Sequence, residues 1–189
     1  RGYQLRVAPK GTLPFDSEAT IDGADAIVTA LRASPSITGV SPVLGATLAL
    51  TGAALPSTFV LGLEPQVQGD YEMQRGHDLD TASASGTLPT QKASEIVNGV
   101  ASNALLSRLG AKLGDTISVA SGLDAQLRTA ARSRRVVLRG EGRFFYVPSE
   151  TPVLALPLET VRELLGDAFR DRMSLAMAGV TPGDSASVE

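Results

Sequence analysis

Alternation of apolar and polar residues is the most regular feature of the chain, and its two-residue period is that of a strand with one buried face. Tyr3, Leu5 and Val7 share one face of the first such segment. A longer alternation covers residues 40–51 and places on one face Val40, Pro42, Leu44, Ala46, Leu48 and Leu50. The same period predicts further strands over residues 58–63, 95–97, 116–120, 135–147, 153–156 and 173–180.

Three other segments repeat their apolar residues at helical spacing. The first contains Ile21, Ala24, Ile27, Val28 and Leu31. Asp22 is its predicted N-cap, and Pro35 ends it, because a residue before proline is driven out of the helical region. The second contains Val100, Ala104, Leu105 and Leu109. It ends at Gly110, which suits a left-handed C′ position, and the third helix covers 158–165 and ends at Gly166.

Both ends of the chain therefore follow the order strand, helix, strand, and a different module lies between them. Two such units can pair into a split β-α-β/β-α-β sheet with helices on one face. We expect an α+β fold in which residues 1–66 and 150–189 form this split sheet. We expect residues 67–149 to form a second small α+β lobe inserted in the middle, with a small-residue loop at 81–90.

Composition narrows the class of protein. A chain of 189 residues can bury a core as one domain or as two small ones. The net charge of −3 gives no indication of a nucleic acid or an anionic membrane as the main partner, and we expect no nucleic acid to bind. The chain has no cysteine, which excludes disulfides, thiolate zinc sites and cysteine nucleophiles.

One stretch requires a test against a membrane span, because no charged residue lies between Arg32 and Glu64. A spanning helix needs about 20 mostly apolar residues. This stretch is interrupted by Pro35, Gly39, Pro42, Gly45, Gly52 and Pro56. Its alternation instead predicts a pair of strands. The chain begins with Arg1, so we expect a piece of a longer protein or the product of signal-peptide cleavage.

The search for catalytic groups finds no constellation. His77 beside Asp78 is the only histidine, and a surface histidine in a polar loop explains it more simply than a general base or metal ligand. No serine lies in a nucleophile elbow, and Gly140-Glu141-Gly142 lacks the helix of a phosphate-binding loop. Glu159 and Glu163 are one helical turn apart, on what we interpret as a solvated helix face. We expect no enzyme activity, no cofactor and no metal.

The densest charged feature is basic and consists of Arg128, Arg132, Arg134, Arg135, Arg139 and Arg143. On an alternating strand, with a bulge expected at Gly140 and Gly142, one side would carry Arg135, Val137, Arg139, Glu141 and Arg143. Such a row could dock an acidic protein surface or lipid headgroups. Two interpretations stay open, because a solvated face that discourages edge-to-edge aggregation would have the same composition.

Aromatic residues follow this basic row directly. Phe144, Phe145 and Tyr146 hold three of the eight Phe and Tyr residues of the chain. Consecutive strand residues point to opposite faces, so at least one ring is expected outside. An exposed ring beside arginines favours an interface. The predicted partner-binding residues are therefore the six arginines together with Phe144 and Phe145.

Several short segments occur in a characteristic order. They are SPSITGVSP at 34–42, VLGLEP at 60–65, QRGHDL at 74–79, EIV, LLSRLG and LGDTI within 95–117, VVLRG at 136–140 and VLALPLETVRELLG at 153–166. In this order they resemble the MacB-like periplasmic core domain of FtsX-like ABC transporter permeases, over about residues 3–180. The chain departs from that pattern at His77, where arginine is common, and at the 81–90 insertion.

The resemblance implies a porter-like sheet made by both ends of the chain, and a non-catalytic domain on the periplasmic side of the bacterial inner membrane. In such permeases the domain is tethered to transmembrane helices of the same polypeptide, and a cytoplasmic ATPase subunit moves those helices. The domain transmits that motion to substrates or to a periplasmic adaptor or lipoprotein, in efflux, lipoprotein release or cell-wall regulation. The isolated piece is expected to be a monomer and the full transporter a dimer.

Two other classes of function remain open at this stage. A free periplasmic solute- or lipid-binding protein would have an apolar pocket and a ligand that raises its thermal stability. An enzyme using His77 and Asp78 would need partner groups that the sequence does not supply.

Overall fold

The computed structural model of the chain describes residues 5–10, 19–67, 69–79, 96–121 and 132–180. Its strands are β1 (Leu5–Val7), β2 (Ile21–Asp22), β3 (Ile37–Thr51), β4 (Ser57–Leu63), β5 (Tyr71–Gly76), β6 (Ile96–Ala101), β7 (Thr116–Ala120), β8 (Ser133–Phe144), β9 (Val153–Pro157), β10 (Arg172–Met173) and β11 (Leu175–Val180). Its helices are α1 (Ala24–Arg32), α2 (Asn103–Leu109), α3 (Leu158–Leu165) and the short 3-10 helix η1 (Asp167–Phe169).

Within the described residues, nine of these strands form one mixed sheet in the order β1-β11-β3-β4-β9-β6-β8-β5, with β7 paired to both β3 and β8. The pairs β4/β9 and β6/β8 are parallel, and the other pairs are antiparallel. A second small sheet joins β2 to β10. The predicted α+β class is confirmed.

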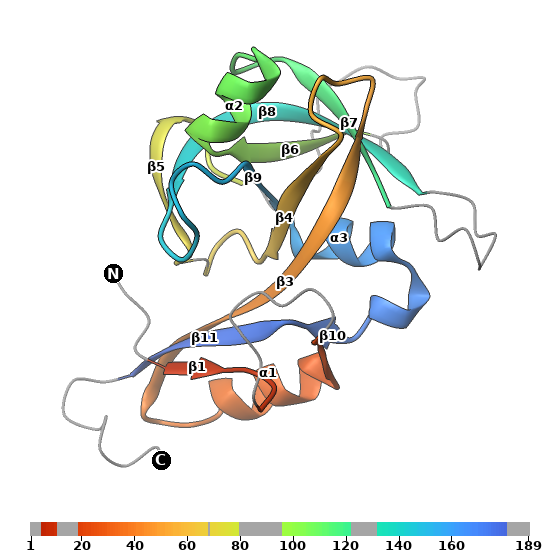
Figure 1. Cartoon of the computed structure of the whole chain (residues 1–189). Coiled ribbons are helices and arrows are strands. Elements are labelled where there is room, and N and C mark those ends of the chain that lie inside the picture. The colour runs from red at the N-terminus through yellow and green to blue at the C-terminus, as the bar shows by residue number, and fades with distance from the viewer. Residues whose placement is uncertain (1–4, 11–18, 68, 80–95, 122–131, 181–189) are drawn as a thin grey trace, which may run out of the picture.

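Strand β3 runs through both ends of the molecule (Figure 1). Its first half pairs with β11, and its second half pairs with β4 and then β7. Helix α1 covers the sheet at the β1/β11 end, and α2 and α3 lie at the other end (Figure 1). One continuous strand therefore belongs to two differently covered parts of the sheet.

The buried apolar residues of the sheet and its helices form three clusters. Cluster A lies under α2 and α3 and contains Leu44, Leu48, Leu105, Val136, Leu138, Leu156, Val161 and Leu164. Cluster B contains Val43, Leu61, Tyr71, Val100, Phe144 and Val153. Cluster C lies under α1 and contains Ala24, Val28, Val40, Met173, Ala176 and Ala178. The long predicted strand thus buries side chains on both faces, whereas the sequence indicated only one buried face.

The structure confirms one predicted helix end and contradicts another. Gly110 has φ 62° and closes α2 in the left-handed conformation, as predicted. The prediction that Asp22 caps α1 is wrong. The N-cap is Gly23, with φ 73° and no side-chain cap. Asp22 lies in β2, where its carboxylate pairs with Arg172 at 2.6 Å.

The strands were located well where their apolar period was strong. The predicted strand 116–120 coincides with β7, and 135–147 is observed as Ser133–Phe144. The strand predicted over 173–180 is interrupted at Ser174, whose hydroxyl accepts a hydrogen bond from the Gly45 amide at 2.9 Å. The edge strand β5 was not predicted, because most of its side chains face solvent.

The sheet is continuous across the boundaries predicted for the inserted lobe. β9 lies between β4 and β6 in the strand order, and β7 pairs with β3. The division at residues 67 and 149 stays a prediction. Among the helices of the described residues, none combines the length and the hydropathy that crossing a bilayer requires.

Candidate functional site

A bulge in β8 decides where its arginines point. Against β6, Leu138 pairs with Gly99 and Gly140 pairs with Val100, so Arg139 is the extra residue. Leu138 belongs to cluster A, whereas a Cβ on Gly140 would meet Val100 of cluster B. The residues that face cluster A are therefore even-numbered before Arg139 and odd-numbered after it.

This exchange corrects the predicted face. Glu141 lies on the α2 side, where its carboxylate accepts a hydrogen bond from Asn103 Nδ2 at 3.2 Å. Arg143, two residues further, shares the face of Glu141. The prediction that Arg135, Arg139 and Arg143 line one side is wrong, although the bulge itself was expected at this place.

The first described arginines of the basic row hold α3. Arg132 Nη1 donates to the Glu163 carbonyl at 2.9 Å, and Arg134 Nη2 donates to the Glu163 carboxylate at 3.0 Å. Arg132 also lies 3.8 Å from Asp167. These two side chains therefore stabilise the position of α3 in the fold. Arg128 lies outside the described residues.

Arg135 and Arg139 lie on the opposite face of β8 from cluster A, and both are exposed. Arg139 Nε donates to Asn98 Oδ1 at 3.4 Å, across the parallel pair with β6. The structure therefore separates the predicted basic patch into three places: the α3 contact, the outer face of β8, and the end of β8 at Arg143.

The end of β8 gathers arginine and aromatic rings. Phe144 is buried and stacks at 5.2 Å on Tyr71 in cluster B, so its ring is not on the surface. Phe145 and Tyr146 are 48% and 42% exposed, and their ring centroids are 6.5 Å apart. Arg143 Cζ lies 5.6 Å from the Phe145 centroid, within cation–π range. We call Arg143, Phe145 and Tyr146 the aromatic tip.

A pocket of about 230 Å³ lies beside the aromatic tip. Its walls come from the end of β8, the start of α2 and the β8–β9 connection, and include Arg143, Phe144, Val147, Pro148 and Val153. Glu141 lines one wall and is largely buried, held by Arg75 Nε at 2.9 Å and by Asn103. The arginines nearest the pocket are compensated, since Arg143 pairs with Glu72 at 2.9 Å.

Two ionisable groups lie close to this region. Burial raises the pKa of Asp70 to about 6, and the Asp70 carbonyl accepts a hydrogen bond from the Phe145 amide at 3.0 Å. Burial also raises the pKa of the Tyr71 phenol, whose hydroxyl donates to Asp78.

His77 and Asp78 both make hydrogen bonds within the fold. Asp78 accepts from the Tyr71 hydroxyl and from the Leu79 amide at 2.7 Å. His77 is exposed, and its backbone amide donates to the Arg139 carbonyl at 3.0 Å. In the part of the chain that the structure describes, no group of three or more acids and histidines is placed to hold a metal ion.

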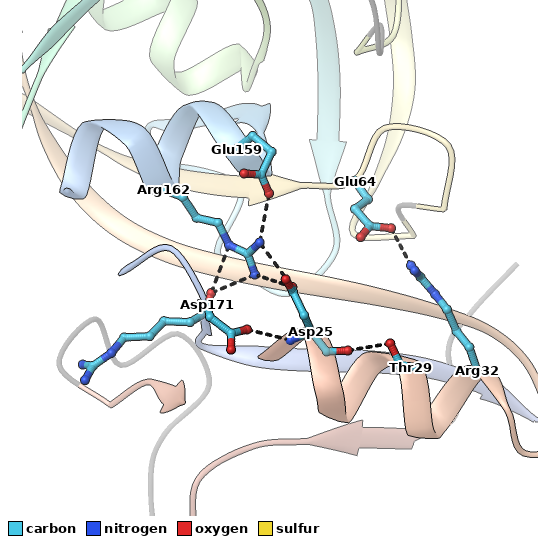
Figure 2. A network of polar contacts seen from close by, with 8 residues as sticks. Asp25, Thr29, Arg32, Glu64, Glu159, Arg162 and Asp171 are labelled. Carbon is cyan, nitrogen blue, oxygen red and sulfur yellow. Dashed lines mark hydrogen bonds and ion pairs between the residues drawn. The ribbon is translucent and has the colours of Figure 1, made fainter. Parts of the chain in front are cut away.

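A buried arginine with exposed carboxylate partners lies between α3 and α1. Arg162 of α3 is only 6% exposed, whereas Glu159 and Glu163 are 74% and 60% exposed, which agrees with their interpretation as a solvated face. Arg162 contacts Glu159 and Asp25, the latter from α1 (Figure 2). The sequence does contain an indication that Arg162 is buried. It lies four residues after Leu158 and three before Leu165, which places it beside the apolar stripe of α3 and not opposite to it.

No family model and no curated protein matches the sequence of the chain. Solved structures do match its fold. The extracellular domain of the ABC-type transporter YknZ from Gram-positive bacteria has a TM-score of 0.58 at 12% identity, and the match covers 89% of this chain and 77% of that one.

Two further structures agree with this match. The periplasmic region of MacB from Actinobacillus actinomycetemcomitans has a TM-score of 0.58 at 17% identity, covering 89% of this chain and 70% of that one. A domain of a protein described as a permease, from Porphyromonas gingivalis, has a TM-score of 0.51 at 17% identity, covering 89% and 72%. The chain therefore has the fold of the extracellular and periplasmic domains of ABC-type transporters.

Proposed function

We propose that the chain is a non-catalytic extracytoplasmic domain of an ABC transporter permease of the efflux or lipoprotein-release type. It couples ATP-driven movement of membrane helices to substrates or to periplasmic partner proteins. The observation that carries this proposal is the shared fold with transporter domains over 89% of the chain.

The position of the first and last strands supports a tethered domain. β1 and β11 are antiparallel neighbours, with Leu5 opposite Ala178. The start of β1 and the end of β11 therefore lie at the same end of the sheet (Figure 1). This geometry suits a domain that hangs from two transmembrane helices of the same polypeptide, which a cytoplasmic ATPase subunit moves. It also suits a location on the periplasmic side of the inner membrane and a dimeric full transporter.

Location and attachment can be tested together with single cysteines, because this chain has none and any cysteine elsewhere in the parent protein can be replaced. Ser107 on α2 is exposed and Ser41 on β3 is fully buried. In the parent protein, Ser107→Cys should react with a membrane-impermeant maleimide in intact cells with a permeable outer envelope. Ser41→Cys is the matched control and should react only after denaturation.

The labelled protein should stay with the membranes after a carbonate wash. Release into the soluble fraction would favour the free solute-binding protein. Protection of Ser107→Cys until the inner membrane is broken would contradict the proposal in either form.

We propose the aromatic tip as the place where a periplasmic adaptor or lipoprotein binds. Phe, Tyr and Arg are enriched at protein interfaces, and Phe145 and Tyr146 are exposed beside Arg143. A photo-crosslinking residue at Phe145 in the parent protein should give a covalent adduct with an extracytoplasmic partner, and the same residue at Ser107 should not. Equal adduct from both positions, or from neither, would remove the tip from consideration.

A further inference from the structure

Arg162 brings together parts of the chain that are far apart in sequence (Figure 2). Its Nη1 donates to Glu159 Oε1 at 2.9 Å, and Nη1 and Nη2 each lie 3.4 Å from Asp25 Oδ1. Its Nε and Nη2 each lie 3.4 Å from the Arg172 carbonyl. All three guanidinium nitrogens therefore have acceptors, from α3 itself, from α1 and from β10.

Helix α1 depends on this region for its first turn. Its N-cap Gly23 offers no side-chain acceptor, and a helix leaves its first amides without internal partners. Asp171 supplies the missing acceptors, through its carboxylate to the Asp25 amide at 2.8 Å and its carbonyl to the Ala24 amide at 3.2 Å. Arg162 then binds the Asp25 side chain. The start of α1 is thus held by the segment between α3 and β10.

The two helices that meet here belong to different cores. The apolar face of α3, with Val161 and Leu164, packs in cluster A. The apolar face of α1, with Ala24 and Val28, packs in cluster C. Each helix is therefore fixed to its own part of the sheet by apolar burial, and the contact between them at Arg162 is polar.

At the far end of α1 a second ion pair completes the attachment. Arg32 Nη2 lies 2.5 Å from Glu64 Oε2, just after β4. Both partners of this pair are substantially exposed, at 45% and 37%. Solvent screens such a pair. The carboxylates that contact Arg162, those of Asp25 and Glu159, are 74% exposed, but the guanidinium itself is 6% exposed and has three partners instead of one.

A buried guanidinium restrains geometry more strictly than apolar contact does. Arginine presents its donors in one rigid plane, and the Arg162 guanidinium is only 6% exposed, so a donor that loses its acceptor is poorly solvated. Sliding of α1 against α3 would break several of these bonds at once. Apolar side chains, by contrast, tolerate small displacements without losing a specific partner.

We propose that Arg162 is a positioning residue that fixes the angle between the α1 end of the sheet and the α3 end, so that a displacement of one is passed to the other. We call the contacts of Arg162 with α1, α3 and β10 the joint. Its use in transmitting motion rests on the proposed function. The joint itself is a property of the chain and can be tested without the transporter.

The experiment measures a distance across the joint. Spin labels go on Ala30→Cys in α1 and Ser107→Cys in α2, both exposed, in a chain with no other cysteine. The double-cysteine chain should give one narrow distance distribution by pulsed electron resonance. Adding Arg162→Met, which keeps similar volume, should at least double the width or add a second distance.

Arg170→Met is the matched control. Arg162 and Arg170 line the same surface cleft, but Arg170 is 79% exposed and pairs with Asp167 three residues away. This substitution should therefore leave the distribution unchanged. Arg162→Lys, which keeps the charge without the planar donors, should give an intermediate width and covers the case in which Arg162→Met fails to fold.

Hydrogen exchange gives the second readout. In Arg162→Met the Ala24 and Asp25 amides should exchange about tenfold faster or more, while those of α2 keep their rates. An unchanged distance distribution in both Arg162 variants, or an equal rise in exchange over the whole chain, would overturn the joint and leave the proposed function standing. Failure of the cell-labelling test would do the reverse.

Discussion

At the scale of single residues, Glu141 is a buried carboxylate that lines the pocket beside the aromatic tip. It is bound by Arg75 and Asn103. Glu141→Gln removes the charge and leaves the Arg75 guanidinium with a weaker acceptor. We expect a loss of about 1–2 kcal/mol in the free energy of unfolding. Urea denaturation checks this, with an unchanged m-value showing that the unfolded state is the same.

Glu72→Gln is the natural comparison for that measurement. Glu72 also pairs with an arginine, Arg143, but both side chains are more than half exposed. Such pairs contribute little, so the expected loss is about 0.5 kcal/mol or less. Equal losses in the two variants would show that burial gives Glu141 no special weight.

Asp70 makes a prediction about pH. Its pKa rises from the usual 3.8 to about 6 in the folded chain, because burial penalises the carboxylate. The folded state therefore binds the proton more tightly than the unfolded state. The resulting stabilisation is complete below about pH 4 and is lost as the pH rises through 6. Over that range it amounts to about 3 kcal/mol at most.

Asp70→Asn resembles the protonated acid at every pH, so it should not lose this stabilisation. The stability of the variant relative to the parent chain should increase between pH 4 and pH 7. Urea titrations of both proteins at four pH values measure the difference, in which all other titrating groups cancel. A difference that stays constant with pH would mean that Asp70 keeps its ordinary pKa.

At the scale of elements, the β8 bulge depends on Gly140. A Cβ there would lie 2.4 Å from the His77 carbonyl oxygen and 2.6 Å from Met73 Cε. The carbonyl is backbone and cannot move aside cheaply. We expect Gly140→Ala to cost about 2 kcal/mol or more in the free energy of unfolding, measured by urea denaturation.

The control is Gly39→Ala, also in a strand. A Cβ at Gly39 would have no neighbour within 4 Å. Replacing this glycine should be neutral or stabilise by about 0.5 kcal/mol through the unfolded state. If Gly140→Ala were equally well tolerated, the close approach of β8 to the His77 carbonyl would not limit the strand.

The sequence predicted those elements whose pattern is local. β7 was predicted because its apolar residues alternate over five consecutive positions. The end of α2 was predicted because Gly110 directly follows its last apolar residue. β5 was missed because an edge strand with one open face has little apolar signal. The faces of β8 were assigned wrongly beyond Arg139, because the pairing partner β6 decides which residue is extra.

The candidate site shows the same limit. An exposed ring after Arg143 was predicted from alternation alone, and Phe145 is exposed. The dispersal of the arginines was not, because Glu163 reaches Arg134 only through the packing of α3 on the sheet. The contact of Arg162 with Asp25, 137 residues away, is likewise contained in no local pattern.

At the scale of the whole molecule, the open question is whether residues 67–149 are a lobe that folds alone. Cluster A takes Leu105, Val136 and Leu138 from that segment. It also takes Ala101, Leu106 and Val119 from that segment, and the others, which belong to β3, β4, β9 and α3, from outside it. Cutting the segment out also breaks its β7–β3 and β6–β9 strand pairings.

We propose that residues 67–149 are a lobe in topology only, and that the excised segment does not fold. The exposed half of cluster A and the unpaired edges of β6 and β7 should leave it without stable tertiary structure. An amide NMR spectrum should show collapsed proton dispersion, whereas the whole chain in the same buffer should show a dispersed one. A dispersed spectrum with cooperative urea unfolding would instead make the segment an independent domain. Joints such as Arg162 would then act within the remaining part of the chain, since α1, α3 and β10 all lie outside the segment.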